Sequence, residues 1–182
     1  FHFWSEPLFG YYNMCDEWVI SKHVEMLTYS MVDYLYIDLT NCSDGVHNIY
    51  TEATDVLLSV LDKYQKQGFD VPKVVFMTSG DNGAAAVRAL YQRYYKPGLY
   101  KDLWYRPATA DNAGNKPMIL GNSLMLQEAS DQEIFNFFYF KNVQNPNGVP
   151  IDDNYPWIDF GEDIFNPAQH NYSGWMAVSV AQ

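Results

Sequence analysis

The sequence predicts an α/β fold built on a parallel sheet, and the expected architecture is a (β/α)8-type barrel that is incomplete in this chain. The first observation is that short apolar strands alternate with amphipathic helices along the 182 residues, which is typical of parallel sheets. The second is that a whole barrel typically needs about 250 residues. We therefore expect one α/β domain over residues 1–182, with an open doubly wound sheet as the alternative.

The two ends of the sequence also favour an incomplete barrel. The chain begins at Phe1 inside an aromatic run and stops at Gln182 after the apolar run 176–181. Domains rarely begin and end inside strands, so the chain is expected to be a fragment of a larger barrel. The last strand would then expose an edge that a second copy or the rest of the barrel covers, at Met176, Val178 and Val180.

The first expected helix follows Asp16, which suits an N-cap. Apolar residues recur after it at helical spacing, at Ile20, Val24, Leu27 and Met31. This helix leads into a buried strand over 33–39, which ends on the polar residues Asp38, Thr40 and Asn41. Polar groups at the carboxyl end of such a strand are candidates for chemistry.

The same unit of helix, apolar strand and polar cluster is expected to repeat downstream. A helix over 51–67 has one apolar face, Gly68 suits its C-cap, and a strand follows over 73–77. The residues after that strand, 78–83, precede a third helix over 84–94. They lack the spacing of a phosphate-binding loop, so we interpret them as a tight turn with a helix cap.

The second half of the chain has shorter elements and longer loops. A long loop over 95–115 precedes a short strand over 118–120, and a capping box is expected from Ser130 to Glu133. Further strands are expected over 135–140 and 175–181, separated by a proline-rich loop. Loops of this length inside a compact domain are usually functional.

Composition excludes several classes of partner. The formal charge of −11 and the sequence pI of about 4.5 argue against nucleic acid and against anionic membrane surfaces. No run reaches the roughly 18 apolar residues of a membrane span. Fifteen Tyr and five Trp suit stacking against sugar rings, although each ring taken alone fits a core position. The spacing of the two Cys and four His predicts neither a disulfide framework nor a metal site, and no cofactor is expected.

Two carboxylates are the candidate catalytic groups. Hydrolysis of a glycosidic bond commonly needs a pair, about 5–5.5 Å apart in retaining enzymes and 6.5–9.5 Å in inverting ones. Glu6 lies in an aromatic loop after an expected strand end, and Asp38 lies at the end of the next strand. The alternatives are a solvated loop carboxylate for Glu6 and a hydrogen bond to neighbouring loop amides for Asp38. The expected substrate-binding residues are His2, Trp4, Tyr11, Tyr12, Asn41, Thr78 and Gln182.

The segment 11–38 resembles a bacterial glycoside-hydrolase-like group that is similar to glycoside hydrolase families 99 and 71. The matching residues are Tyr11, Tyr12, Val19, Ile20, His23, Met26, Leu27, Val32, Asp33 and Asp38, with Met31 in place of the usual Gly. Segments 116–121 and 179–182 also fit. The resemblance implies a (β/α)8 barrel that acts on glycans. The family's catalytic carboxylates lie on later strands in a Trp/Glu-rich motif that this sequence lacks, so none is carried over.

The resulting functional hypothesis is a glycosidase that acts on a glycan or polysaccharide at the carboxyl ends of its strands. The alternative is a non-catalytic carbohydrate-binding or scaffolding module on the same fold, since fold alone does not decide function. The sequence does not fix the compartment, and a periplasmic or extracellular location is favoured. Without a carried-over catalytic residue, Asp38 is expected to be a substrate-side or structural carboxylate.

Overall fold

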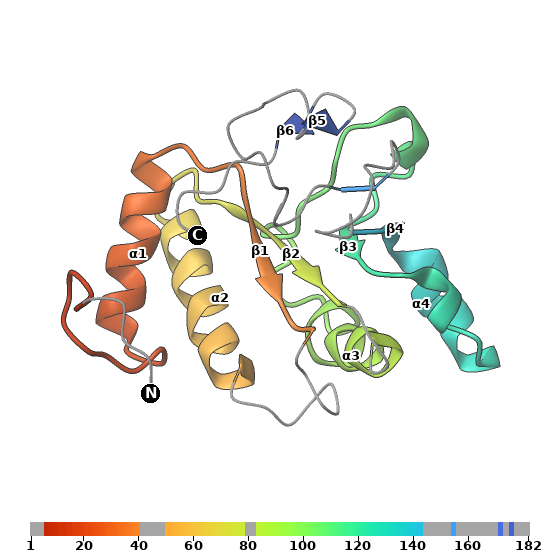
Figure 1. The fold of residues 1–182 in the computed structure, drawn as a ribbon, viewed down its shortest axis with the longest axis horizontal. Helices are drawn as coiled ribbons and strands as arrows, with labels where there is room; N and C mark the ends of the chain where they lie inside the picture. Colours follow the sequence, from red (N-terminus) through yellow and green to blue (C-terminus); the bar gives the residue numbers. More distant parts are fainter. Residues whose placement is uncertain are drawn as a thin grey trace.

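Four parallel strands in consecutive order form the main sheet of the protein (Figure 1). They are β1 (Tyr34–Asp38), β2 (Lys73–Met77), β3 (Met118–Leu120) and β4 (Tyr139–Lys141). The computed structural model describes residues 6–40, 50–78, 83–143, 154–155, 171–172 and 175–176. Within these residues the predicted α/β class and parallel sheet are confirmed.

The register brings the carboxyl ends of the four strands to one edge of the sheet. Asp38 pairs with Met77, Met77 with Leu120, and Leu120 with Lys141. The residues in this row therefore follow one another across the sheet, and the loops that follow the strands begin from the same edge. The strands expected over 33–39, 73–77 and 118–120 are confirmed, the first being one residue shorter at each end.

The helices connect successive strands and begin where the sequence predicts. They are α1 (Glu17–Tyr29), α2 (Tyr50–Lys66) and α3 (Gly83–Leu90), which continues as the π-helix η1 (Tyr91–Tyr95). Asp16 caps α1, because its Oδ1 accepts hydrogen bonds from the backbone amides of Trp18 and Val19 at 2.9 and 3.2 Å. Gly68 follows α2 at φ 93°, a left-handed conformation that favours glycine.

One residue of the first helix pattern lies outside the helix. Met31 was expected on the apolar face of α1, yet it lies two residues beyond its end and is 86% exposed. Its φ of 55° is also left-handed, and a residue in that conformation cannot continue the helix. The apolar spacing therefore overestimated the length of α1 by two residues.

The α-helices of the described residues pack on one face of the sheet. The larger core joins Ile20 and Val24 of α1, Leu58 and Leu61 of α2, and residues of α3, η1 and the short helix α4 (Gln132–Phe137) to one side of the strands, at Val74, Phe76 and Ile119. Phe138, which precedes β4, belongs to the same core. The opposite face forms a second cluster that contains no helical residue, made of Val75, Met77, Met118, Leu120 and Tyr155 with Tyr34, Tyr36, Tyr105, Tyr139 and Val143 at its margin. The sheet therefore has a helix-covered face and an opposite, tyrosine-rich face.

The strand expected over 135–140 is wrong in its first half. Residues Gln132–Phe137 form the short helix α4, and only Tyr139–Lys141 are a strand. The capping box also differs from the expected one: it joins Glu128 and Asp131 at the 3-10 turn η4 (Ala129–Asp131). Aromatic residues favour strands, but here the cap and the burial of Ile134 against the helix-covered face decide for a helix.

The last expected strand also differs in its pairing. Trp175–Met176 (β6) pairs antiparallel with Asn171–Tyr172 (β5), and the two form a separate sheet. The expected edge positions Val178 and Val180 lie outside the described residues. Among the helices that the structure describes, none is long and apolar enough to cross a membrane.

Candidate functional site

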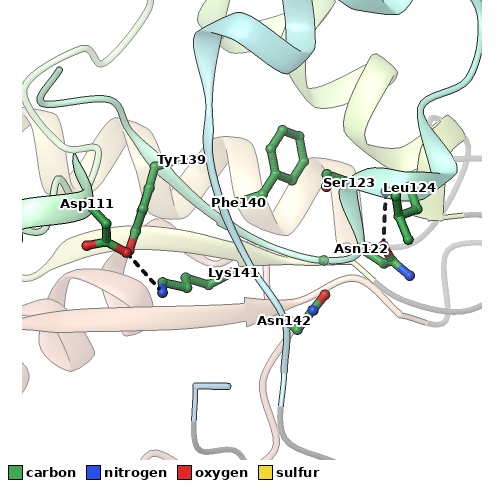
Figure 2. Close-up of a pocket in the computed structure, with 9 residues that line it drawn as sticks. Asp111, Asn122, Ser123, Leu124, Tyr139, Phe140, Lys141 and Asn142 are labelled. Atoms are coloured by element: carbon green, nitrogen blue, oxygen red, sulfur yellow. Dashed lines mark hydrogen bonds and ion pairs between the residues drawn. The ribbon is translucent and has the colours of Figure 1, made fainter. Parts of the chain in front are cut away.

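Two adjoining cavities of about 420 Å³ each open at the carboxyl ends of β2, β3 and β4. They share Gly121, Asn122 and Asn142. The first, shown in Figure 2, is further lined by Asp111, Ser123, Leu124, Tyr139, Phe140 and Lys141. The second is further lined by Thr78, Met125, Val143 and Asn154. This is the edge of the sheet at which the sequence predicts a site.

The ends of β2 and β3 are in close contact where the two cavities adjoin. The Thr78 amide and hydroxyl both donate to the carbonyl of Leu120, at 2.8 and 3.2 Å. The Gly121 amide donates to the carbonyl of Lys141 at 2.9 Å. A Cβ on Gly121 would lie 2.5 Å from Thr78 Oγ1, so this position requires glycine. Thr78 is thus an expected substrate-binding residue that does line a cavity.

Three uncharged amide side chains contribute to the polar lining. Asn122 Oδ1 accepts a hydrogen bond from the amide of Leu124 at 2.9 Å and begins the 3-10 turn η3 (Ser123–Met125). Asn142 lies beside it in Figure 2 and has no side-chain hydrogen bond to another described residue. Asn154 lines the second cavity. Amides offer both donors and acceptors, as hydroxyl-rich ligands require.

A charged cluster lines the side of the first cavity that lies away from Asn122 (Figure 2). Tyr139 and Lys141 point from alternate positions of β4 towards Asp111, on the 3-10 turn η2 (Ala110–Asn112), while Phe140 points away (Figure 2). Lys141 Nζ lies 3.1 Å from Asp111 Oδ2, and the Tyr139 hydroxyl donates to the same carboxylate oxygen.

This cluster has a defined charge state. The hydrogen bond from Tyr139, with those from Thr109 and Lys141, holds the pKa of Asp111 well below its usual range. Burial and the bond to Asp111 raise the pKa of Tyr139. Asp111 is therefore ionised and Tyr139 is a neutral donor at neutral pH.

The tyrosine-rich face of the sheet, to which Tyr139 belongs, carries further phenol groups. Tyr34 stacks on Tyr105 with ring centroids 4.3 Å apart, and Tyr36 lies beside Tyr34 at 5.3 Å. Burial raises the pKa of Tyr36, and the neighbouring Tyr34 adds to the shift. Burial likewise raises the pKa of Tyr155. These rings remain neutral and extend an amphipathic aromatic surface along the tyrosine-rich face of the sheet.

Asp38 lies at the end of β1, as the sequence predicts, but its carboxylate accepts a hydrogen bond from the turn that follows. Its Oδ1 accepts a hydrogen bond from the Thr40 amide at 2.8 Å, as the structural interpretation of this residue expects. Its side chain is exposed at the end of β1, and it lines neither of the two cavities. This contact makes Asp38 a turn-forming carboxylate.

Replacing Asp38 with alanine should destabilise the protein, whereas asparagine should not. Alanine removes the acceptor for the Thr40 amide, which we expect to cost about 1 kcal/mol of unfolding free energy. Asparagine keeps an equivalent oxygen. Urea unfolding of both variants measures the difference, and equal midpoints would contradict the assignment.

The expected site residues on the N-terminal loop, Glu6, Tyr11 and Tyr12, do not meet Asp38 in the described structure. In Figure 1 the loop over 6–16 lies outside α1, with α1 and α2 between it and the end of β1. Glu6 and Tyr11 are exposed on this loop, and the Tyr12 ring packs against His23 of α1 with centroids 5.5 Å apart. The remaining candidates, His2, Trp4, Asn41 and Gln182, lie outside the described residues.

The sequence did not predict the cluster of Asp111, Tyr139 and Lys141 or a role for the side-chain amide of Asn142. A signal existed for Lys141 and Asn142 and for Asn122, because polar residues directly follow the expected strands there. No local pattern marks Asp111, which lies in a long loop and reaches the site only through the fold. Comparison with protein-family models, with curated proteins and with solved structures finds no match for this chain.

Proposed function

We propose that this protein is a glycoside hydrolase that acts on a glycan or polysaccharide at the carboxyl ends of its strands. The observation that carries the proposal is the pair of adjoining cavities at this edge, lined by amides, hydroxyls and a tyrosine. Such a lining offers hydrogen-bond partners for sugar hydroxyls and an aromatic surface for their C–H faces.

The arrangement of the elements supports a (β/α)8-type barrel over a doubly wound sheet. The strand order β1-β2-β3-β4 has no reversal, whereas doubly wound sheets reverse their order at a switch point. Helices on a single face of the described sheet agree with this choice, because barrels keep their helices outside and fill the interior with strand side chains. The left-handed Met31 also supports the resemblance, since families 99 and 71 have Gly there.

Only one of the two carboxyl roles in glycoside hydrolysis can be assigned to a residue that lines the described cavities. A glycosidase needs a protonated carboxyl as general acid as well as an ionised carboxylate. Asp111 can serve only as the ionised carboxylate, because the hydrogen bonds from Tyr139 and Lys141 keep its pKa low. Its role would be to bind hydroxyls or to stabilise the positive charge that develops on the sugar.

The same observation favours a second candidate function, a non-catalytic carbohydrate-binding module. Of the carboxylates in the described residues, Asp111 alone lines the two cavities. One carboxylate suffices for binding, whereas the usual hydrolytic mechanism needs two. The two candidates share the ligand class and differ in turnover.

Replacing Asn142 with alanine should weaken glycan binding about 3- to 10-fold, the worth of one or two uncharged hydrogen bonds. Asn142 lines both cavities. Asn136→Ala is the matched control, because Asn136 is exposed on α4, lines neither cavity and accepts a side-chain hydrogen bond from Gln132. Calorimetric titration with neutral oligosaccharides measures the affinity, and chromatography of the same mixtures detects cleavage.

The outcomes separate the two candidate functions. New reducing ends formed by the wild-type protein would support the hydrolase. Saturable binding without cleavage would support the module. If no oligosaccharide binds and none is cleaved, both are wrong.

A further inference from the structure

We infer that the first cavity selects neutral, hydroxyl-rich sugars over acidic ones, because it presents the carboxylate of Asp111 to the ligand and keeps the ammonium of Lys141 beneath it. This inference rests on the proposed function and names the substrate class of that same site. It makes Asp111 a specificity-determining residue.

The two charges of the ion pair differ in exposure. The side chain of Lys141 is 13% exposed and that of Asp111 is 56% exposed. The ammonium also lies 5.4 Å from the centroid of the Tyr139 ring, so the ring and the carboxylate both stabilise its charge. A ligand that enters the cavity therefore meets the anion first.

The carboxylate is oriented before any ligand binds. Lys141 Nζ and the Tyr139 hydroxyl both engage Asp111 Oδ2. A carboxylate has about four acceptor sites on its two oxygens, so capacity remains for sugar hydroxyls. Hydrogen bonds to a charged acceptor are stronger than those between neutral groups, and holding the group in place reduces the entropy lost on binding.

The surrounding charges disfavour an acidic ligand. A uronate or sulfate placed against Asp111 would meet a like charge, which discriminates against it. Asn122, Ser123 and Asn142 supply only neutral groups to the rest of this cavity. The net charge of −11 adds a long-range repulsion of anions.

Titration calorimetry with two matched sets of oligosaccharides tests the inference. The neutral set is cellohexaose, mannohexaose and xylohexaose, and the acidic probe is hexagalacturonate. We expect at least one neutral hexasaccharide to bind about 10-fold or more tightly than the acidic one, the worth of one charged hydrogen bond. The difference in affinity between the neutral and acidic ligands should narrow at high salt, because salt screens the repulsion between the acidic ligand and the protein.

Three variants locate the selectivity. Asp111→Asn should lower the affinity for the neutral ligand about 10-fold. The affinity for the acidic ligand should then become comparable. Tyr139→Phe removes only the hydroxyl that orients Asp111. It should lower the affinity for the neutral ligand but keep the preference for neutral over acidic ligands. Asp70→Asn is the control, since Asp70 is exposed and lines neither cavity. Thermal unfolding checks that each variant is folded.

The failure of the inference differs from the failure of the proposed function. Tight binding of hexagalacturonate, or unchanged affinities in Asp111→Asn, would overturn the inference while glycan binding stands. If none of the hexasaccharides binds the wild-type protein, the proposed function fails and the inference fails with it.

Discussion

Replacing Arg88 with methionine should lower the free energy of unfolding by about 2–3 kcal/mol at neutral pH. Arg88 on α3 makes two parallel hydrogen bonds to Asp131, from Nε to Oδ1 at 2.8 Å and from Nη2 to Oδ2 at 2.7 Å. Asp131 is 2% exposed, while the arginine side chain is 31% exposed. Methionine keeps the aliphatic stem but leaves a buried carboxylate without its cation.

The loss should depend on pH in a defined direction. The hydrogen bond from Arg88 lowers the pKa of Asp131 below its usual value. A carboxylate with a lowered folded-state pKa contributes stability above its unfolded pKa of about 3.9, and that contribution is lost as the pH falls through the folded value. Arg88→Met should therefore differ most from wild type near about pH 7, and the difference should shrink as the pH falls through the lowered pKa of Asp131.

Chemical denaturation at several pH values measures this effect. Lys63→Met is the control, because it breaks an exposed ion pair with Glu17 at 3.1 Å, and pairs of this kind contribute little. An Arg88→Met penalty that does not change between neutral and acidic pH would show that packing, not the charge of Asp131, is responsible.

Replacing Gly121 with alanine should destabilise the protein by about 2–3 kcal/mol and also distort the site. The added Cβ would lie 2.5 Å from the Thr78 hydroxyl and 3.0 Å from the Thr78 carbonyl oxygen. The carbonyl belongs to the backbone where β2 ends, so it cannot move without shifting the strand. Because Gly121 lines both cavities, we expect glycan affinity to fall as well.

Gly114→Ala is the matched control for this prediction. An added Cβ there meets only the Lys116 side chain, at 3.7 Å, which is ordinary contact. Thermal unfolding of the two variants gives the comparison, and the double variant Gly121→Ala with Thr78→Ala tests the mechanism. The double variant should recover part of the loss, since it removes the hydroxyl but not the carbonyl. Equal stability of Gly121→Ala and Gly114→Ala would contradict the predicted clash.

The elements with strong local signals were predictable from the sequence. The cap at Asp16, the apolar face of α2 and the glycine at 68 define the first two helices, and the strand over 73–77 is entirely apolar between its ends. Each of these signals acts within a few residues. The short aromatic segment 132–140 gives no such signal, because six residues are too few for helical periodicity and its helix depends on packing.

By itself, the sequence determined the α/β class, the parallel strands and the edge of the sheet that carries the cavities, because apolar periodicity and polar strand ends are local properties. Only the tertiary structure decided which side chains meet there. It brings Asp111 to Lys141, thirty residues later in the chain, and it leaves Asp38 bonded to its own turn. The physical reason is that an ion pair depends on distances in space, and these follow from how β3 and β4 pair and from where the loop before β3 packs.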